Sequence, residues 1–496
     1  MKNLRHPAQP TGKLRAVFAL GCGLSLAAAV IAVAPATAQE LPQAPTPNPA
    51  VLRAPGGVPV AEATSSPMPL GLDEAIDRGM RLNLQQLLAQ QNERAVHGEL
   101  LTAENSLLPT LTAQLATGTQ EINLAAMGFK PSVVASLAPA LGLGNFTFNE
   151  IVKVSTTSAQ VNFTQQLFNL PAYEFYRAAQ KATIVAQLTT KSGRNDMALR
   201  VGTAYLQALA DAAQITNAQA LEKADEVVLR QATLSHDAGV GTHLDVLRAQ
   251  VQLQTQQQVR ISAEDTFAKD KIALNRLIGL PADQTITLTD TVPFSELAAM
   301  PEPAALQLAF TQRYDYLSLQ AQLDADQHSA KAIRYQRLPT LAFGGFYGVL
   351  GETEGLYHGD FTAQGKLEFP IFEEGSLRGE REVAGAQISR VRAQIANLRV
   401  AIDQQIRDSL LDVQSSAELV KVARSNVELS TQELKDATDR FTSGVTDNLP
   451  VVQAQATLAA AETRLVETEF QYNQSKLALA RNIGVVETEY KAYLGR

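Results

Sequence analysis

The sequence carries the turn of a helical hairpin twice, and this duplication limits what the chain can fold into. The segment AGVGTHLDVLRAQ at Ala238–Gln250 returns 205 residues later as SGVTDNLPVVQAQ at Ser443–Gln455, with six of thirteen positions identical. In each copy a glycine, Gly239 or Gly444, follows one long helical pattern and precedes another. Because glycine readily adopts the left-handed conformation that ends many helices, each copy predicts a helix–turn–helix tip.

Each expected tip joins a long helix to a shorter return helix. The first pair is predicted over 171–237 and 242–278, and the second pair over 376–442 and 448–483. At 1.5 Å per residue the long helices would span about 100 Å and the return helices about 55 Å. A helix predicted over 72–108, also about 55 Å long, would make up the difference if it stacked end to end with the first return helix.

Segments of alternating polarity follow the first helix of each half. The motif Leu-Pro-Thr-Leu occurs at 108–111 and again at 338–341, where it ends the helices predicted over 72–108 and 304–338, because a residue before proline is disfavoured in a helix. Period-two alternation then predicts strands, with residues 120–150 expected as a loop between the first two. The four strands are expected over about 109–119, 151–168, 339–350 and 360–372.

The last of these strands shows which medium it faces. Phe361, Ala363, Gly365, Leu367, Phe369 and Ile371 would lie on one face, and Thr362, Gln364, Lys366 and Glu368 on the other. An apolar and a polar face suit a membrane barrel with lipid outside and a wet lumen. Lys366 and Glu368 would line this lumen, either tuning its selectivity or serving only as polar lining. Because the smallest membrane barrels have eight strands and open edges are not tolerated in lipid, four strands predict a barrel shared between chains.

The chain divides into six expected parts. They are a signal peptide at 1–38, a Pro-rich linker at 39–70, a first repeat at 71–281 with its tip at about 238–243, a connector at 282–303, a second repeat at 304–485 with its tip at about 443–448, and a tail at 486–496. Four cations precede the apolar run of the signal, and Ala36-Thr37-Ala38 fits the cleavage site. Removing these four charges from the formal net charge of −8 leaves −12, which disfavours nucleic acid as a partner. Cys22, inside the apolar run, lacks the leucine three residues before it that a lipoprotein site would have, so lipidation is disfavoured.

Taken together, these features resemble the TolC-like family of outer membrane efflux proteins over about Leu72–Tyr490. The resemblance rests on the duplication, the two Leu-Pro-Thr-Leu junctions, the two tips, and the strand ends Gln166-Leu167-Phe168 and Pro370-Ile371-Phe372. It implies a mainly α fold with a β-barrel portion, in which each chain of a homotrimer gives four strands to one barrel in the lipid of the outer membrane and helices to a long periplasmic tube.

The same resemblance implies partners and a closing device. The tips would dock on a periplasmic adaptor linked to an inner-membrane pump, through Gly239, Val240, Gly241, Thr242, Gly444, Val445 and Thr446. Family members often close the channel with carboxylates and an arginine beyond the second tip glycine, but here Pro450 and Gln453 stand where the carboxylates are expected. Closure candidates in this chain are therefore Asp245, Arg248 and Asp447.

No sequence motif predicts an enzyme, a cofactor or a metal site. The glycine-rich run at 239–242 lacks the lysine of a phosphate-binding loop and is interpreted as a helix end. His236 and His243 bracket the first tip, where a weak metal site is less favoured than polar turn residues. The sequence thus predicts a passive export channel. The alternatives are a channel for type I protein secretion, a periplasmic coiled-coil adaptor and an exported structural coiled coil.

Overall fold

The computed structural model describes residues 56–58, 62–64, 66–128, 132, 149–290, 294–353 and 355–495. The expected signal peptide with Cys22 and most of the expected linker lie outside the described residues. Within the described residues the chain forms two compact units, a sheet unit of 111–162 and 345–362 and a larger helical unit made of the remainder.

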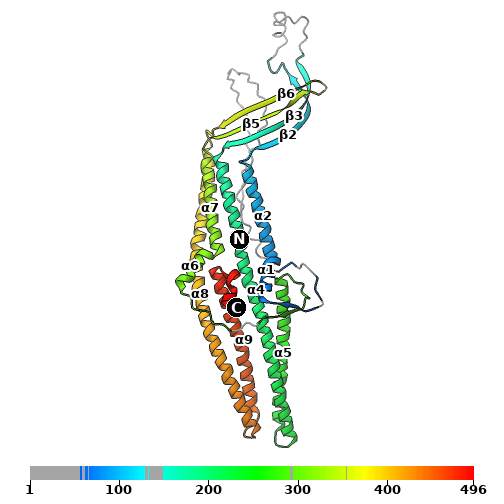
Figure 1. Cartoon of the computed structure of the whole chain (residues 1–496), viewed down its shortest axis with the longest axis vertical. Helices are drawn as coiled ribbons and strands as arrows, with labels where there is room; N and C mark the ends of the chain where they lie inside the picture. Colours follow the sequence, from blue (N-terminus) through cyan, green and yellow to red (C-terminus); the bar gives the residue numbers. More distant parts are fainter. Residues whose placement is uncertain are drawn as a thin grey trace, which may run out of the picture. The chain divides into compact units, whose positions relative to one another are not determined.

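Four long strands form one sheet, in the order β2-β3-β5-β6. They are β2 (Thr110–Asn123), β3 (Ile151–Phe168), β5 (Thr340–Glu352) and β6 (Tyr357–Glu368), shown in Figure 1. β2 extends into the expected loop at 120–150, and β6 begins three residues before the expected strand at 360–372. The expectation that this strand reaches residue 372 is wrong, because β6 ends at Glu368, just before Phe369-Pro370. Proline has no N–H to give to a sheet, which accounts for the early end.

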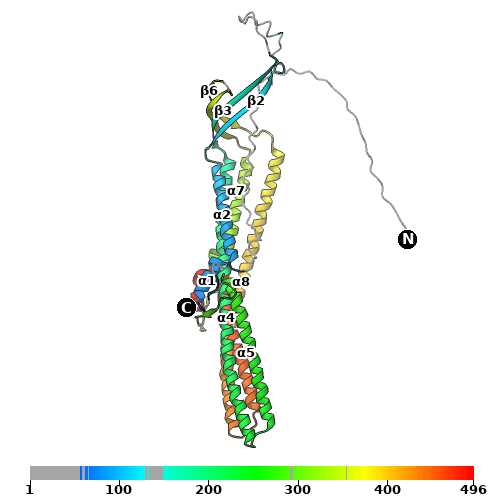
Figure 2. The same ribbon diagram turned by 90° about the vertical axis from the view of Figure 1, so that its right-hand side faces the viewer.

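Four helices make up the two hairpins. α4 (Leu170–Asp237) is followed by α5 (His243–Leu277), and α8 (Glu374–Thr442) by α9 (Leu449–Ile483). α4 packs against α5, and α8 against α9, along the return helices, as Figures 1 and 2 show. No helix in the described part of the chain is both long and apolar enough to cross a bilayer.

The helices that precede the strands are each broken once. The expectation of one helix over 72–108 is wrong, since α1 (Leu72–Leu82) and α2 (Leu84–Asn105) are separated by Asn83. Asn83 has extended backbone angles, and its side chain accepts a hydrogen bond from Gln85 N at 2.9 Å, which caps α2. Likewise Arg313 separates α6 (Glu302–Gln312) from α7 (Tyr314–Tyr335), where one helix over 304–338 was expected.

The C-terminal end of each return helix fits against one of these breaks. Asn83 Nδ2 donates to Leu277 O at 3.2 Å, and a Cβ on Gly279 (φ +73°) would lie 2.7 Å from Leu82 Cβ. A Cβ on Gly484 (φ +99°) would lie 2.9 Å from Arg313 N. Both positions therefore require glycine for two reasons: the backbone is left-handed, and a neighbouring segment approaches too closely to leave room for a Cβ. α1, α2 and α5 all pack along α4, so the predicted end-to-end arrangement of the shorter helices is present.

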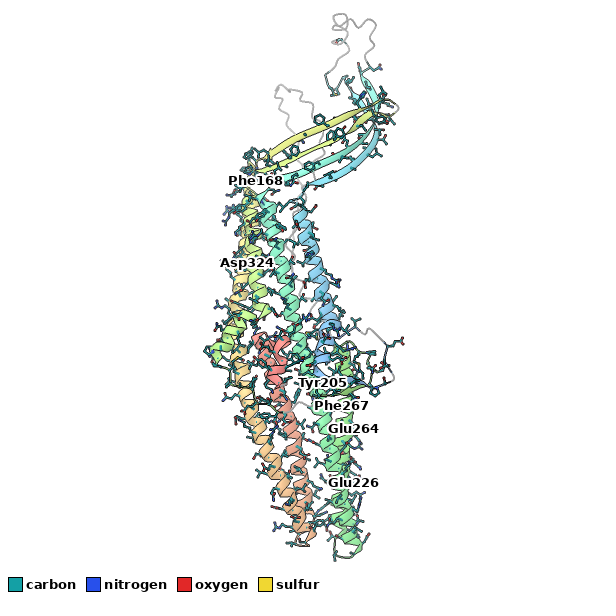
Figure 3. All side chains as sticks on the ribbon, viewed as in Figure 1. Phe168, Tyr205, Glu226, Glu264, Phe267 and Asp324 are labelled. Atoms are coloured by element: carbon teal, nitrogen blue, oxygen red, sulfur yellow. The ribbon has the colours of Figure 1, made fainter. Side chains whose placement is uncertain are left out.

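The main core lies where these ends meet. It contains Tyr205 from α4, Ile278 after α5, Ile402 and Ile406 from α8, and Ile483 from α9. Residues 486–496, expected as a tail, include α10 (Val486–Leu494), which buries Val486 and Leu494 in the same core. The short strands β1 (Met68–Leu70) and β4 (Ile286–Leu288) pair in parallel beside it. Tyr205, labelled in Figure 3, donates its hydroxyl to Leu70 O and Asp290 Oδ2, both at 2.9 Å.

Candidate functional site

The first tip is a helix end closed by two backbone hydrogen bonds. After α4, Gly239 adopts φ +73°, Gly239 N donates to His236 O at 2.9 Å, and Val240 N donates to Ser235 O at 3.0 Å. These two bonds define a Schellman motif, in which the left-handed residue satisfies the last helical carbonyls. The side chain of Val240 is 83% exposed, so the tip presents an apolar residue to its surroundings.

The second tip repeats this geometry at Gly444. Its φ is +72°, Gly444 N donates to Phe441 O at 3.0 Å, and Val445 N donates to Arg440 O at 3.0 Å. Val445 is 67% exposed. The two tips therefore share both backbone conformation and an exposed valine directly after the glycine.

The helices that follow the tips begin differently. Thr242 caps α5, because its hydroxyl oxygen accepts from Asp245 N at 3.2 Å while Asp245 Oδ2 accepts from Thr242 N at 3.1 Å. This reciprocal capping box fixes the first turn of α5. Asn448 precedes α9 without capping it by its side chain. Its Nδ2 instead donates to Asp245 O at 2.8 Å, across the two tips.

A charged contact joins the tips as well. Arg248 Nη1 lies 3.2 Å from Asp447 Oδ2 on the second tip and 3.7 Å from Asp245 Oδ1 on its own helix. The three residues predicted as closure candidates are thus brought together within one chain. Asn448 was not predicted as a site residue, because an asparagine at the start of a helix is expected only to cap that helix. Its role across the tips has no signal in the sequence.

Side chains on β2 and β3 define the two faces of the sheet unit. Thr117 and Thr157 hydroxyls lie 3.0 Å apart, and Thr119 and Ser155 hydroxyls lie 2.8 Å apart, so the two strands run antiparallel. This face is odd-numbered, and besides these hydroxyls it carries a group of apolar residues. They include Leu111, Ala113, Leu115, Ala159, Val161, Tyr347, Val349 and Phe361. The even-numbered residues of β6 are polar, whereas those of β5 include Ala342, Phe346 and Leu350, so the apolar group on the odd face suits lipid and the even face of β6 suits water.

The residues predicted to line the lumen lie on the even-numbered positions of β6. Thr362, Gln364, Lys366 and Glu368 are all exposed, and Lys366 Nζ lies 2.8 Å from Glu368 Oε2. Both side chains of this pair are more than 60% exposed, so the contact is well solvated and adds little to stability. The pair leaves both charges available to an aqueous space.

The histidines of the first tip lie close together. The rings of His236 and His243 are 5.6 Å apart, and His236 Nδ1 is 3.4 Å from Gly241 O. Among the described residues there is no group of three or more histidine, cysteine or carboxylate side chains that could hold a metal ion.

Sequence analysis also missed a row of buried carboxylates on α4. Asp211, Ala218, Asp225 and Ala232 are all buried and recur every seven residues on the side of α4 that packs on α5. Burial raises the pKa of both Asp211 and Asp225 to about 6. The seven-residue spacing could have revealed these two acids in the sequence, because residues seven apart on a packed helix lie on the same face, here the one that contacts α5.

Comparison with known proteins gives the family. The model of the family described as "Outer membrane efflux protein" matches residues 80–280 and 305–485. The alkaline protease secretion protein AprF of Pseudomonas aeruginosa is 23% identical over 347 residues, covering 67% of this chain and 70% of AprF. The outer membrane protein TolC of Escherichia coli is 21% identical over 386 residues, covering 71% of this chain and 76% of TolC. The solved structure of the Campylobacter jejuni CmeC outer membrane channel matches with a TM-score of 0.69 at 14% identity, covering 84% of this chain and 86% of CmeC.

These matches confirm the expected family, the mainly helical fold with a strand barrel and the location. The family consists of outer membrane channels, which are not enzymes. The duplicated hairpins, the two-faced sheet and the family match over both repeats agree with one another. The chain belongs to the outer membrane efflux protein family and is an export channel of the outer membrane, with its helices in the periplasm.

Proposed function

We propose that three copies of this chain form one passive channel, whose helical tips both close it and dock a periplasmic adaptor linked to an inner-membrane pump. The observation that carries the proposal is the four-stranded sheet, whose edge strands β2 and β6 pair with no further strand among the described residues. Unpaired backbone groups in lipid cost several kcal/mol each, so these edges need strands from other copies. Three copies supply twelve strands, which is enough for a closed barrel.

Exposed apolar side chains on the helical unit support the same assembly. Val400, Leu411 and Val422 on α8 recur every eleven residues, and each is at least 58% exposed. Eleven residues make three helical turns, so these side chains form one stripe along the helix. A stripe of this kind is better suited to packing against a neighbouring copy than to lining a water-filled tube.

The contacts between the tips support a closing role. Arg248 and Asp447 tie the first tip to the second, and Asn448 ties the same two segments through Asp245 O. Because the charged pair is partly exposed, it is weak on its own and can be broken without unfolding either hairpin. We infer that opening the channel separates the two tips of each chain and breaks these contacts.

The exposed valines support docking. Val240 and Val445 lie at equivalent places on the two tips and are the most exposed apolar residues there. Two equivalent valines per chain would give a trimer six matching contact points for the ends of adaptor hairpins. The exported substrate is either a small molecule or a protein, the latter as the name of AprF suggests for that relative.

Purified full-length protein tests the assembly and the conduit. We expect a heat-resistant oligomer of three chains that conducts ions in planar bilayers. Leu411→Glu should weaken the oligomer, whereas Gln414→Glu, at an exposed polar position one turn away, should not. A monomer that inserts and conducts alone would refute the shared barrel.

Docking is tested separately in cells. Val240→Asp and Val445→Asp should abolish export while the oligomer and its membrane insertion remain. The matched control is Val227→Asp on α4, since Val227 is 58% exposed but lies away from the tip. Unchanged export by both tip variants would reject the docking role. Susceptibility of the strain to a panel of drugs, dyes and metals, together with assay of secreted protease, would separate the two substrate classes.

A further inference from the structure

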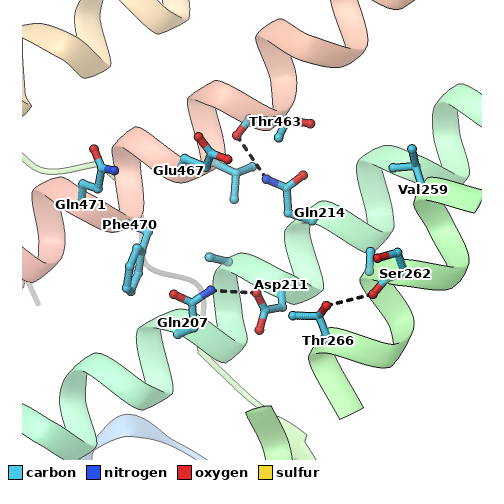
Figure 4. Close-up of a pocket in the computed structure, with 13 residues that line it drawn as sticks. Gln207, Asp211, Gln214, Val259, Ser262, Thr266, Thr463, Glu467, Phe470 and Gln471 are labelled. Atoms are coloured by element: carbon cyan, nitrogen blue, oxygen red, sulfur yellow. Dashed lines mark hydrogen bonds between the residues drawn. The ribbon is translucent and has the colours of Figure 1, made fainter. Parts of the chain in front are cut away.

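A cavity of about 540 Å³ lies between the two hairpins, bounded by α4, α5 and α9. Figure 4 shows its lining, which includes Asp211 from α4, Val259 from α5 and Phe470 from α9. Its volume is in the range of small-molecule sites, and like them it combines apolar walls with a few polar groups. It is distant in sequence from the tips and from the strands, so it belongs to neither proposed role.

One buried oxygen at the cavity, on Asp211, accepts no hydrogen bond from the described residues. Asp211 is only 6% exposed. Its Oδ1 accepts from Gln207 Nε2 at 2.9 Å, whereas its Oδ2 is buried and has no hydrogen-bond partner among the described residues. Buried polar atoms are nearly always paired, and leaving a charged one unpaired is costly. A ligand that donates a hydrogen bond and carries positive charge would remove this cost.

The other charges around the cavity also favour a cation. Asp270 on α5 lies beside Asp211 and raises its pKa, first by a hydrogen bond that favours the protonated carboxyl and then by charge repulsion. Glu467 on α9 adds a third carboxylate, and Arg464 lies 3.1 Å from it as its partner. No cation in these contacts reaches Asp211 itself. An anionic ligand would therefore be repelled by Asp211, which none of these cations neutralises.

The lining distinguishes an organic cation from a metal ion. The described residues provide no cluster of three or more metal-ligating side chains here. Phe470 instead presents an aromatic ring and Val259 an aliphatic wall to the cavity. Aromatic rings attract ammonium groups, and apolar walls favour the body of an organic molecule.

We propose that this cavity binds an organic ammonium ion, whose N–H donates to Asp211 Oδ2 and whose apolar body lies against Phe470 and Val259. The ligand bridges α4, α5 and α9 and therefore holds the two hairpins of one chain together. This site goes beyond the proposed channel function and does not depend on conductance or on docking.

Binding is coupled to protons. Burial, with a further contribution from Asp270, raises the pKa of Asp211 to about 6, against the opposing hydrogen bond from Gln207. Below this pH the carboxyl carries a proton that the ammonium ion must displace. The affinity should therefore be constant above about pH 7 and fall up to about tenfold for each pH unit well below 6. Glu467 is the other charged residue that lines the cavity, Arg464 pairs with Glu467, and Asp270 lies beside Asp211.

The test uses the detergent-purified full-length oligomer and phenethylammonium as the probe, with binding measured by calorimetry. We expect saturable binding at pH 7.5 that weakens at pH 5, and none by 2-phenylethanol, the neutral analogue. Asp211→Asn should weaken binding at least tenfold. Asp225→Asn is the matched control, because Asp225 is a second buried carboxylate of α4 with a raised pKa that does not line the cavity.

Four results would overturn the proposal: no saturable binding by the unmodified protein, equal binding of 2-phenylethanol, unchanged affinity in Asp211→Asn, or an equal loss in Asp225→Asn. If Asp211→Asn fails to assemble, Phe470→Leu provides a second variant, which should weaken the probe severalfold while keeping its pH dependence. Unchanged affinity in Phe470→Leu would then count against the site.

Discussion

Replacing Asp225 by asparagine should stabilise the α4–α5 hairpin at neutral pH and remove much of its pH dependence. Asp225 is 2% exposed and lies on the side of α4 that packs on α5. Its Oδ2 accepts a long hydrogen bond from Gln252 Nε2 at 3.4 Å, and its Oδ1 has no partner among the described residues. Burial raises the pKa of this carboxyl from 3.8 to about 6, and the hydrogen bond from Gln252 only partly offsets it.

The direction of the pH effect on stability depends on whether the closed or the opened hairpin binds the proton of Asp225 more tightly. The closed hairpin holds the proton up to about pH 6, whereas an opened and hydrated carboxyl releases it near pH 4. The closed state is therefore most stable at low pH and loses stability as the pH rises from about 4 through 6. Well above pH 6 the loss reaches about 3 kcal/mol, and between pH 5 and pH 8 it amounts to about 1.4 kcal/mol, or tenfold in the opening equilibrium.

Hydrogen exchange followed by mass spectrometry measures this opening in the intact oligomer. After correction for intrinsic exchange rates, peptides of α4 around residue 225 should open about tenfold more often at pH 8 than at pH 5. In Asp225→Asn the same peptides should show little pH dependence and stronger protection at pH 8. Peptides around Asp211 provide an internal comparison, because that second buried acid, with Asp270 beside it, is unchanged in the variant.

Two outcomes would refute the reasoning. Protection around residue 225 that rises with pH in the unmodified protein would show that the ionised form is favoured in the closed hairpin. An identical pH profile in the unmodified protein and in Asp225→Asn would show that this carboxyl does not control the opening.

Three further predictions concern the tips, the strands and the helical core. Arg248→Ala should change stability by less than about 1 kcal/mol, because its contact with Asp447 is partly exposed, yet it should raise the conductance of the closed channel in planar bilayers. Lys366→Glu should shift the reversal potential in a salt gradient toward cation selectivity, because it reverses a charge on the polar face of β6. Gly79→Val should lower the free energy of unfolding by about 1–3 kcal/mol, because a Cβ there would lie 2.5 Å from Val201 Cγ2 and force α1 away from α4. The measurement is the temperature at which the oligomer dissociates and unfolds.

Each of these has a matched control. Lys269→Ala removes an exposed ion pair within one turn of α5 and should leave conductance unchanged. Lys153→Glu reverses a charge on the opposite, odd-numbered face of the sheet and should not alter selectivity. Gly98→Val places a side chain where no atom lies within 4 Å and should have a much smaller effect than Gly79→Val. Equal effects of a variant and its control would contradict the corresponding prediction.

Local chemistry explains why the hairpins and strands could be predicted from the sequence. Gly239 and Gly444 end their helices because each adopts the left-handed backbone, which is a property of the glycine and its position. The strands follow from alternation, and Leu-Pro-Thr-Leu marks where each preceding helix must stop. These signals act within a few residues and need no knowledge of the partner segment.

The features that were missed depend on distant contacts. Arg313 breaks a helix although it is neither glycine nor proline, and its guanidinium donates to Asn482 O at 3.3 Å and to Gln405 Oε1 at 2.7 Å. Asn83 takes part in the equivalent break through Leu277 O. The bond from Asn448 to Asp245 O joins residues 203 apart. Only the packing of one hairpin end against another selects these conformations, so periodicity along the chain does not reveal them.

The unpaired edges of the sheet also affect how the protein is made. A newly exported chain presents β2 and β6 with nothing to pair with until it meets other copies. Assembly should then be steeply dependent on the local concentration of chains, and insertion into the membrane cannot be completed before it. During that interval the exposed edges are prone to pairing with any other extended strand. Newly exported chains would therefore depend on factors that shield extended strands in the periplasm, and a shortage of such factors should deplete this channel sooner than barrels that close from a single chain.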